Sequence, residues 1–218
     1  MSLRLKVCCI ASVTEARLAL ASGANILGLV SAMPSGPGPI AEELVAEIAA
    51  QVPRPMGTWL LTSLTDADAI IAQHARCGTT GIQLTDSLEP GGLASLRKAL
   101  PDVTLVQVVH VISAESVAEA VEAAPFADAV LLDSGNPNLA VKELGGTGRV
   151  HDWSLSAEIV RCCPKPVFLA GGLRPDNVRA AVATVRSAGV DLCSGVRTEG
   201  RLDAAKLAAF VAALRATA

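Results

Sequence analysis

The sequence of 218 residues has very few aromatic side chains: two Trp, three Phe and no Tyr. Proteins that bind single-stranded nucleic acids usually stack the bases on aromatic rings, so this scarcity argues against that class of ligand. The 18 Lys and Arg residues are balanced by 21 Asp and Glu residues, which gives a formal charge of -3. Such a balance provides no excess of positive charge for a phosphate backbone. We therefore expect no nucleic-acid partner.

Long apolar runs are also missing, although 51% of the residues are hydrophobic and the mean hydropathy is +0.46. A membrane-spanning helix needs about 18 or more consecutive apolar residues. The apolar runs of this chain are short and are interrupted by Gly, Pro, Asn or charge, as in residues 24–33. Arg4 and Lys6 interrupt the apolar pattern at the start, where no cleavable signal region is visible. The sequence predicts no membrane partner.

The cysteines lack the spacing of a zinc site or of a redox motif. There is no Cys-x-x-Cys pattern and no nearby pair of histidines. Six cysteines are too few for a disulfide scaffold in a chain of this length, and reduced thiols in a cytoplasmic protein are the better interpretation. They are Cys8, Cys9, Cys77, Cys162, Cys163 and Cys193.

A short aliphatic run, a Gly, Pro or Ser break and an Ala/Leu/Glu-rich stretch recur in this order along the chain. Short continuous runs of Val, Ile and Leu are typical of parallel strands that are buried on both faces. We expect strands at 5–10, 26–30, 56–61, 81–84, 103–111, 129–132, 167–170 and 190–193. We expect helices at 14–22, 41–50, 65–76, 91–99, 114–124, 154–161, 177–185 and 203–215. Suitable helix caps are Ser12 or Thr14, Thr65 and Asp203.

The alternation of strands and helices predicts an α/β fold, either an open doubly wound sheet or a closed barrel. A dinucleotide-binding sheet needs a Gly-x-Gly-x-x-Gly turn after its first strand, but residues 8–11 read Cys-Cys-Ile-Ala. Eight strand–helix units of about 27 residues each suit a (β/α)8 TIM barrel. No linker divides the chain, so we predict a single (β/α)8 domain over residues 1–218.

Catalytic residues of such barrels lie at the carboxyl ends of the strands. Asp133 ends a buried strand there, and it could be a general acid or base, a helix cap or an ion-paired turn residue. Cys8 and Cys9 are neighbours on the first expected strand, so only one of them should face the barrel axis. A thiol at this end could act as a base or nucleophile if nearby positive charge lowers its pKa. Alternatively, both cysteines are small apolar core residues.

Glycine-rich loops follow the last strands. Gly171 and Gly172 come after the seventh strand, and Ser194 and Gly195 come after the eighth. Many (β/α)8 barrels hold a phosphate between these two loops, with a short helix N-terminus nearby. The Gly-rich segment 145–148 after the sixth strand could cover a substrate or present amide groups to the phosphate. The alternatives are tight turns for the first two loops and a flexible crossover for the third.

Segments along nearly the whole chain, taken together and in order, resemble those of phosphoribosylanthranilate isomerases. The match includes the strand start Lys-Val-Cys, the strand Val-Leu-Leu-Asp-Ser and the pair Gly-Gly-Thr-Gly and Asp-Trp-Ser. The segments are 6–8, 23–24, 28–30, 82–84, 128–134, 145–148, 152–154, 169–173, 177–178, 189–191 and 194–196.

The resemblance implies a barrel of the ribulose-phosphate-binding type that acts in tryptophan biosynthesis. The implied reaction is an Amadori rearrangement of an N-(5-phosphoribosyl)amine to a 1-amino-1-deoxyketose 5-phosphate, without a metal or organic cofactor. By this resemblance, Asp133 is the general acid and Cys8 the general base, and Gln83 contacts the substrate. The partner is a small phosphorylated sugar amine. Its phosphate would be held by Gly146, Gly171, Gly172, Ser194 and Gly195.

The sequence departs from the family pattern at several positions. Cys9 stands where the family has a glycine, and Arg197 stands where it has a glutamate. The family's arginine for the anthranilate carboxylate is missing, and Pro37 lies near its place. Either another group such as Arg197 supplies this charge, or the amine is not anthranilate. A silent barrel that binds a sugar phosphate or a protein remains a third interpretation, and a homodimer is compatible with the sequence.

Overall fold

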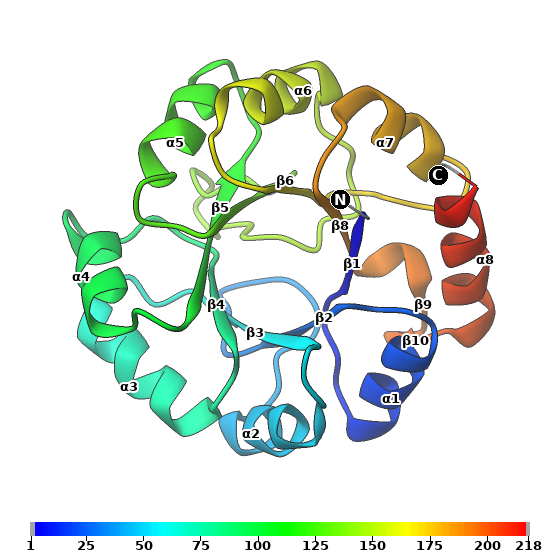
Figure 1. Ribbon diagram of the computed structural model, residues 1–218, viewed down its shortest axis with the longest axis horizontal. Helices are drawn as coiled ribbons and strands as arrows, with labels where there is room; N and C mark the ends of the chain where they lie inside the picture. Colours follow the sequence, from blue (N-terminus) through cyan, green and yellow to red (C-terminus); the bar gives the residue numbers. More distant parts are fainter. Residues whose placement is uncertain (1–2, 217–218) are drawn as a thin grey trace.

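The eight parallel strands close into a barrel in which each strand pairs with its neighbours in sequence and β8 pairs with β1 (Figure 1). The structure, a computed structural model, describes residues 3–216. The predicted (β/α)8 fold is confirmed. The strands are β1 (Arg4–Val7), β2 (Ile26–Val30), β3 (Gly57–Thr62), β4 (Gly81–Leu84), β5 (Thr104–His110), β6 (Ala129–Asp133), β7 (Val167–Leu169) and β8 (Gly189–Leu192).

A ring of helices surrounds the barrel, one after each strand. Several begin at side chains that accept hydrogen bonds from free backbone N–H groups, as Ser12 does for α1 and Asp203 for α8. Asp66, rather than the expected Thr65, caps α3. The helices are α1 (Val13–Ala21), α2 (Glu42–Gln51), α3 (Ala67–Cys77), α4 (Gly92–Ala99), α5 (Glu115–Ala123), α6 (Trp153–Cys162), α7 (Val178–Val185) and α8 (Ala204–Arg215).

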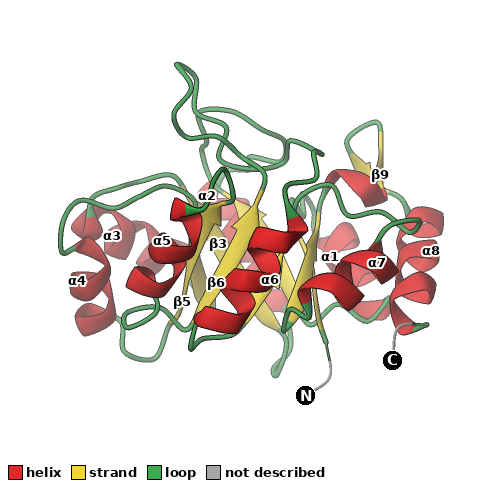
Figure 2. Cartoon of the chain, turned by 90° about the horizontal axis from the view of Figure 1, so that it is seen from above, coloured by secondary structure: helices red, strands yellow, loops and turns green. Residues whose placement is uncertain are grey.

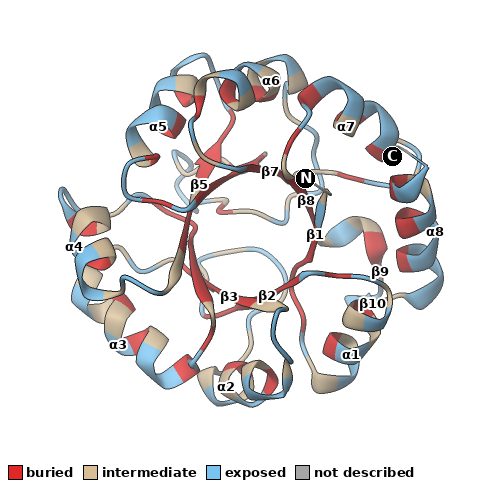
Figure 3. Ribbon diagram, viewed as in Figure 1, coloured by how far each residue is buried: buried red, intermediate tan, exposed pale blue. Residues whose placement is uncertain are grey.

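The strands are buried from both sides, as the short aliphatic runs predict (Figure 3). An aliphatic layer joins them to the helices, and a separate cluster fills the barrel interior. Trp59 and Phe168 meet inside the barrel, edge to face, with ring centroids 5.1 Å apart. Two of the few rings of this chain therefore fill the barrel below its carboxyl end. No helix in the described part of the chain has the length and apolar character to span a membrane.

Long loops rise from the carboxyl end of the barrel, on the same side as β9 (Figure 2). After β8 the chain forms a 3₁₀ turn (Ser194–Val196) and a small hairpin of β9 (Arg197–Thr198) and β10 (Arg201–Leu202), none of which was predicted. The first strand is shorter than expected because Cys9 has a φ of 61°, which turns the chain out of the extended conformation.

Candidate active site

An open pocket lies at the carboxyl ends of the strands. Including the open solvent at its mouth, it encloses about 740 Å³. It is lined by almost all of the residues that the sequence singled out, which come from six different strand ends or loops: Cys8, Gln83, Asp133, Gly146, Gly171, Gly172, Ser194 and Gly195. Arg197 is not among the lining residues.

A buried ion pair lies beside Cys8. The Lys6 Nζ atom is 2.6 Å from Asp191 Oδ2, and the Lys6 side chain has no exposed surface. A Cβ atom on Gly28 would lie 2.8 Å from Cys8 Sγ and 3.0 Å from Lys6 Nζ, so the thiol and the ammonium group approach the same glycine. Lys6 also lies over the Trp59 ring, 5.8 Å from its centroid. The side chain of Cys8 is therefore close to a positive charge that solvent does not screen.

The surroundings of Cys8 favour its thiolate. Hydrogen bonding from the Cys9 side chain outweighs the effect of burial and, with the charge of Lys6, lowers the pKa of Cys8 to about 6. Burial by itself lowers the pKa of Lys6, but the charges of Asp191 and Cys8 raise it above its ordinary value, so Lys6 stays protonated. Cys8 is thus ionised at neutral pH and can accept a proton.

Asp133, the last residue of β6, is 6% exposed and lines the same pocket as Cys8. Within residues 3–216 its carboxylate neither caps a helix nor forms an ion pair, since Asp152 caps α6. Gly145 comes so close that a Cβ atom there would lie 2.9 Å from Asp133 Oδ2. The carboxyl group is therefore free for a ligand under a loop that contacts it through backbone only.

The loops after β7 and β8 present backbone N–H groups to the pocket. Gly171 and Gly172 have φ values of 82° and 59°, a left-handed conformation that glycine adopts without strain. Among the described residues, no acceptor bonds the N–H groups of Gly172, Ser194 or Gly195. Free backbone N–H groups that converge from neighbouring loops can form a concave site for an anion. Gly146 and Gly148 extend this rim from the loop after β6.

Comparison with known proteins identifies the family. The model of the N-(5'-phosphoribosyl)anthranilate isomerase family matches residues 5–213. The chain belongs to this family. It is 35% identical to N-(5'-phosphoribosyl)anthranilate isomerase 2 of Methanosarcina mazei over 211 residues, which cover 96% of this chain and 92% of the relative. It is 37% identical to the isomerase of Haloferax volcanii over 214 residues, covering 97% and 93% of the two chains.

A solved structure of a phosphoribosyl anthranilate isomerase has the same fold. It was determined in complex with reduced 1-(o-carboxyphenylamino)-1-deoxyribulose 5-phosphate. Its TM-score is 0.82 at 22% sequence identity, and the match covers 99% of this chain and all of the other chain. The predicted fold and family are thus both confirmed.

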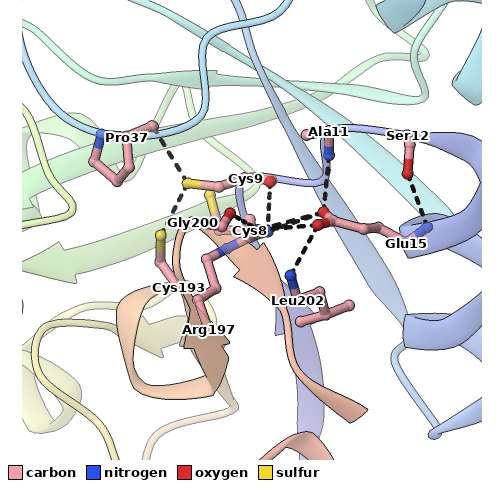
Figure 4. Close-up of polar contacts among 10 residues, drawn as sticks. All are labelled: Cys8, Cys9, Ala11, Ser12, Glu15, Pro37, Cys193, Arg197, Gly200 and Leu202. Carbon is pink, nitrogen blue, oxygen red and sulfur yellow. Dashed lines mark hydrogen bonds and ion pairs between the residues drawn. The ribbon is translucent and has the colours of Figure 1, made fainter.

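Cys9 is where the sequence-based expectation was wrong. Strand parity placed only one of the two cysteines in the pocket, but both line it. The reason is that β1 ends at Val7 and that Cys9 has a left-handed φ, which is typical of glycine. Glycine is also the residue of the family pattern at this position. In Figure 4 the Cys9 thiol points toward Cys193 and toward the carbonyl oxygen of Pro37.

Asp191 and Lys6 are site residues whose roles the sequence reasoning missed. Asp191 lines the pocket, and its second oxygen, Oδ1, has no partner among the described residues. Gln83 Oε1 is likewise buried and unpartnered at the pocket. Buried polar atoms are normally paired, so both oxygens are available to ligand donors. The sequence does contain a signal for these two residues. Each is a charged residue flanked by apolar neighbours inside a strand, Lys6 in β1 and Asp191 in β8.

The structure places Arg197 beneath the site rather than in it. Its guanidinium group lies within 3.3 Å of both Glu15 carboxylate oxygens and donates to the carbonyl oxygens of Cys8 and Cys9 (Figure 4). Glu15 in turn accepts from the N–H groups of Ala11 and Leu202. These contacts occupy both terminal nitrogen atoms of the Arg197 guanidinium group and hold the β1 end against the β9–β10 hairpin. The side chain therefore does not line the pocket.

The rim between the loops after β2 and β6 is closely packed. A Cβ atom on Gly146 would lie 2.5 Å from Pro37 Cδ, so the two loops touch through a proline and a glycine.

The pocket lining contains no Lys, Arg or His side chain within the described part of the chain. The side-chain donors that this lining offers to a carboxylate are therefore neutral ones.

Proposed function

We propose that this chain isomerises N-(5'-phosphoribosyl)anthranilate by an Amadori rearrangement, with Cys8 as general base and Asp133 as general acid. The observation that carries the proposal is that Cys8 and Asp133 line one pocket. The Cys8 thiol lies beside the buried Lys6 ammonium group, and the Asp133 carboxyl group forms no ion pair within residues 3–216. These groups extend from β1 and β6, which are not neighbouring strands. A sugar between them can therefore meet an acid and a base on different sides.

The reaction needs two proton transfers, each of which one of these groups can perform. Protonation of the furanose ring oxygen by Asp133 breaks the bond between this oxygen and C1, and the amine nitrogen forms a Schiff base with C1. The Cys8 thiolate then removes the proton from C2, and the resulting enolamine rearranges to the 1-amino-1-deoxyketose. Positioned acids and bases of this kind typically accelerate proton transfer by about 10² to 10⁴.

The substrate phosphate is proposed to bind at the free N–H groups of Gly172, Ser194 and Gly195, with Gly171 and Gly146 completing the rim. These groups are fixed backbone donors, which bind a dianion without the entropic cost of ordering long side chains. Gln83 Oε1 and Asp191 Oδ1 lie deeper in the pocket and are available to accept hydrogen bonds from the sugar hydroxyl groups.

A second candidate is the same rearrangement with an amine other than anthranilate. It is favoured by the absence of Lys, Arg and His from the lining among the described residues, because anthranilate has a carboxylate. The comparison of phosphoribosylanthranilate with the corresponding aniline derivative separates the two candidates. A kcat/KM for the aniline compound that equals or exceeds that for anthranilate favours the second, and a clear preference for anthranilate rejects it.

The test of the proposed function is the loss of substrate fluorescence when purified protein is mixed with phosphoribosylanthranilate. We expect turnover by the intact protein and a loss of about 10³-fold or more in kcat for Cys8→Ser and for Asp133→Asn. Matched controls are Cys162→Ser on α6 and Asp102→Asn, an exposed residue before β5 at the other end of the barrel. An intact protein without turnover rejects the proposal, and full activity of either site variant rejects that residue's role.

We propose that the enzyme acts in the cytoplasm, because every cysteine is a free thiol and free thiols suit a reducing compartment. The homodimer stays a prediction, which sedimentation equilibrium of the purified protein measures directly.

A further inference from the structure

Two thiols meet at the mouth of the pocket. Cys9 Sγ and Cys193 Sγ are 2.9 Å apart, and both residues line the pocket. They follow the paired strands β1 and β8, just beyond the last register pair, Val7 and Leu192. A disulfide has a sulfur–sulfur distance of about 2.0 Å, so less than ~1 Å of movement separates this pair from a bond.

From this geometry we propose that Cys9 and Cys193 form a modification site, a dithiol that a peroxide or another small thiol oxidant closes to an intrachain disulfide. Of the four other cysteines, Cys8 is the sequence neighbour of Cys9 and receives hydrogen bonding from its side chain. Cys77, Cys162 and Cys163 have no partner sulfur at hydrogen-bond distance among the described residues.

The two sulfurs differ in accessibility, which orders the steps. Cys193 is half-buried at the mouth, whereas Cys9 is 5% exposed and lies behind it. Peroxide therefore reaches Cys193 first and converts its thiol to a sulfenic acid, releasing one water. The Cys9 sulfur then attacks the sulfenic sulfur, and a second water leaves. In total the two thiols lose two protons and two electrons, and the peroxide is reduced to two waters.

The disulfide is expected to inhibit the reaction, a consequence that depends on the proposed function. The Cys9 thiol is the group whose hydrogen bonding helps to keep Cys8 ionised, and it loses its proton when the disulfide forms. Cys193 immediately precedes Ser194 and Gly195, whose N–H groups are assigned to the phosphate. A bond to Cys9 pulls this loop toward the β1 end. Oxidation therefore disturbs the base and the anion site together.

The experiment exposes the intact protein, Cys193→Ser and the control Cys162→Ser to hydrogen peroxide, then alkylates free thiols and maps the peptides by mass spectrometry. Cys162 is a half-buried thiol on α6 outside the pocket. We expect a peptide linking Cys9 to Cys193 in the intact protein and in the control, with at least tenfold loss of turnover that dithiothreitol restores. Cys193→Ser should retain its own starting activity under the same exposure.

The outcomes separate this proposal from the proposed function. The linkage is read by mass and needs no turnover, so an inactive protein that forms it supports the dithiol site and rejects only the isomerase. A missing linkage, a linkage through Cys8, or an equal loss of activity in Cys193→Ser overturns the inference. An equal loss of activity in Cys193→Ser would reflect direct oxidation of Cys8. The same peptide map detects this oxidation as a change in the mass of the peptide that contains Cys8.

Discussion

Lys6 and Asp191 form an ion pair across the seam where the first and last strands close the barrel. The two residues stand opposite each other in the register of β1 and β8, and Nζ and Oδ2 are 2.6 Å apart. Burial raises the pKa of Asp191 above its ordinary value, and the charge of Lys6 opposes this and favours the carboxylate. A buried charge is costly without a partner, so each group keeps the other in place. The seam thereby fixes a positive charge next to Cys8.

The first prediction is that kcat/KM depends on a group with a pKa of about 6. Cys8 must be deprotonated to act as a base, and its pKa is lowered to about 6. We expect kcat/KM to be unaffected by this group above about pH 7 and to fall about tenfold per pH unit below about pH 6. The rate of alkylation by iodoacetamide without substrate should follow the same curve. An acid limb of the kcat/KM profile near the ordinary pKa of a thiol would contradict the prediction that the residues around Cys8 lower its pKa.

The second prediction concerns Lys6. Replacement by Met, combined with Asp191→Asn to avoid an unpaired buried charge, removes the positive charge beside Cys8. We expect the acid limb of the kcat/KM profile to move upward by about one pH unit or more. Lys98→Met, an exposed lysine on α4, is the control and should leave the limb in place. An unchanged limb in the double variant assigns the lowered pKa to Cys9 alone.

The third prediction is that Gly145→Ala impairs catalysis. The new Cβ would lie 2.9 Å from Asp133 Oδ2 at a φ of 140°, so the carboxyl group or the loop must move. Displacement of a catalytic group by about 1 Å can cost about 100-fold in rate. Gly78→Ala is a matched control, because it also has a positive φ but no neighbouring atom within 4 Å. If both variants lose activity equally, backbone strain rather than contact with Asp133 explains the effect.

The fourth prediction separates a structural role of Arg197 from a substrate-binding role. Its side chain is 7% exposed and is paired with Glu15. Arg197→Met and Glu15→Gln should each lower the free energy of unfolding by about 3 kcal/mol, because each leaves a largely buried partner. The double variant should cost clearly less than the sum. Urea titration measures this, with exposed Arg179→Met as the control. Additive losses would show that the pair is not coupled.

The sequence was sufficient to predict the barrel and the order of its units, because strands buried on both faces leave a clear alternation of aliphatic and helical segments. It also placed Asp133 and the glycine loops correctly at the carboxyl end, since position along the chain decides this in a barrel. What it could not predict depends on conformation or register. The side that Cys9 faces follows from a left-handed φ, and the pairing of Lys6 with Asp191 from the β1–β8 register.

Arg197 illustrates a different reason for an incomplete prediction. Its position after the eighth strand is correct for a substrate contact, but the direction of a long side chain depends on the partners that the fold supplies. Glu15 comes from α1, which is far away in sequence, and its carboxylate holds the guanidinium group outside the pocket. A pattern of residues locates such a group near the site without showing which way it extends.

The closure of the barrel by β1 and β8 also determines when, during synthesis of the chain, the surroundings of Cys8 can form. Cys8 is made early in synthesis, while Asp191 and Cys193 belong to the last strand and the loop that follows it. Until β8 is in place, Lys6 has no buried anion opposite it and the thiol of Cys8 has no closed pocket around it. A nascent chain on the ribosome therefore lacks this charged seam, and the surroundings that lower the pKa of Cys8 are complete only when the barrel closes.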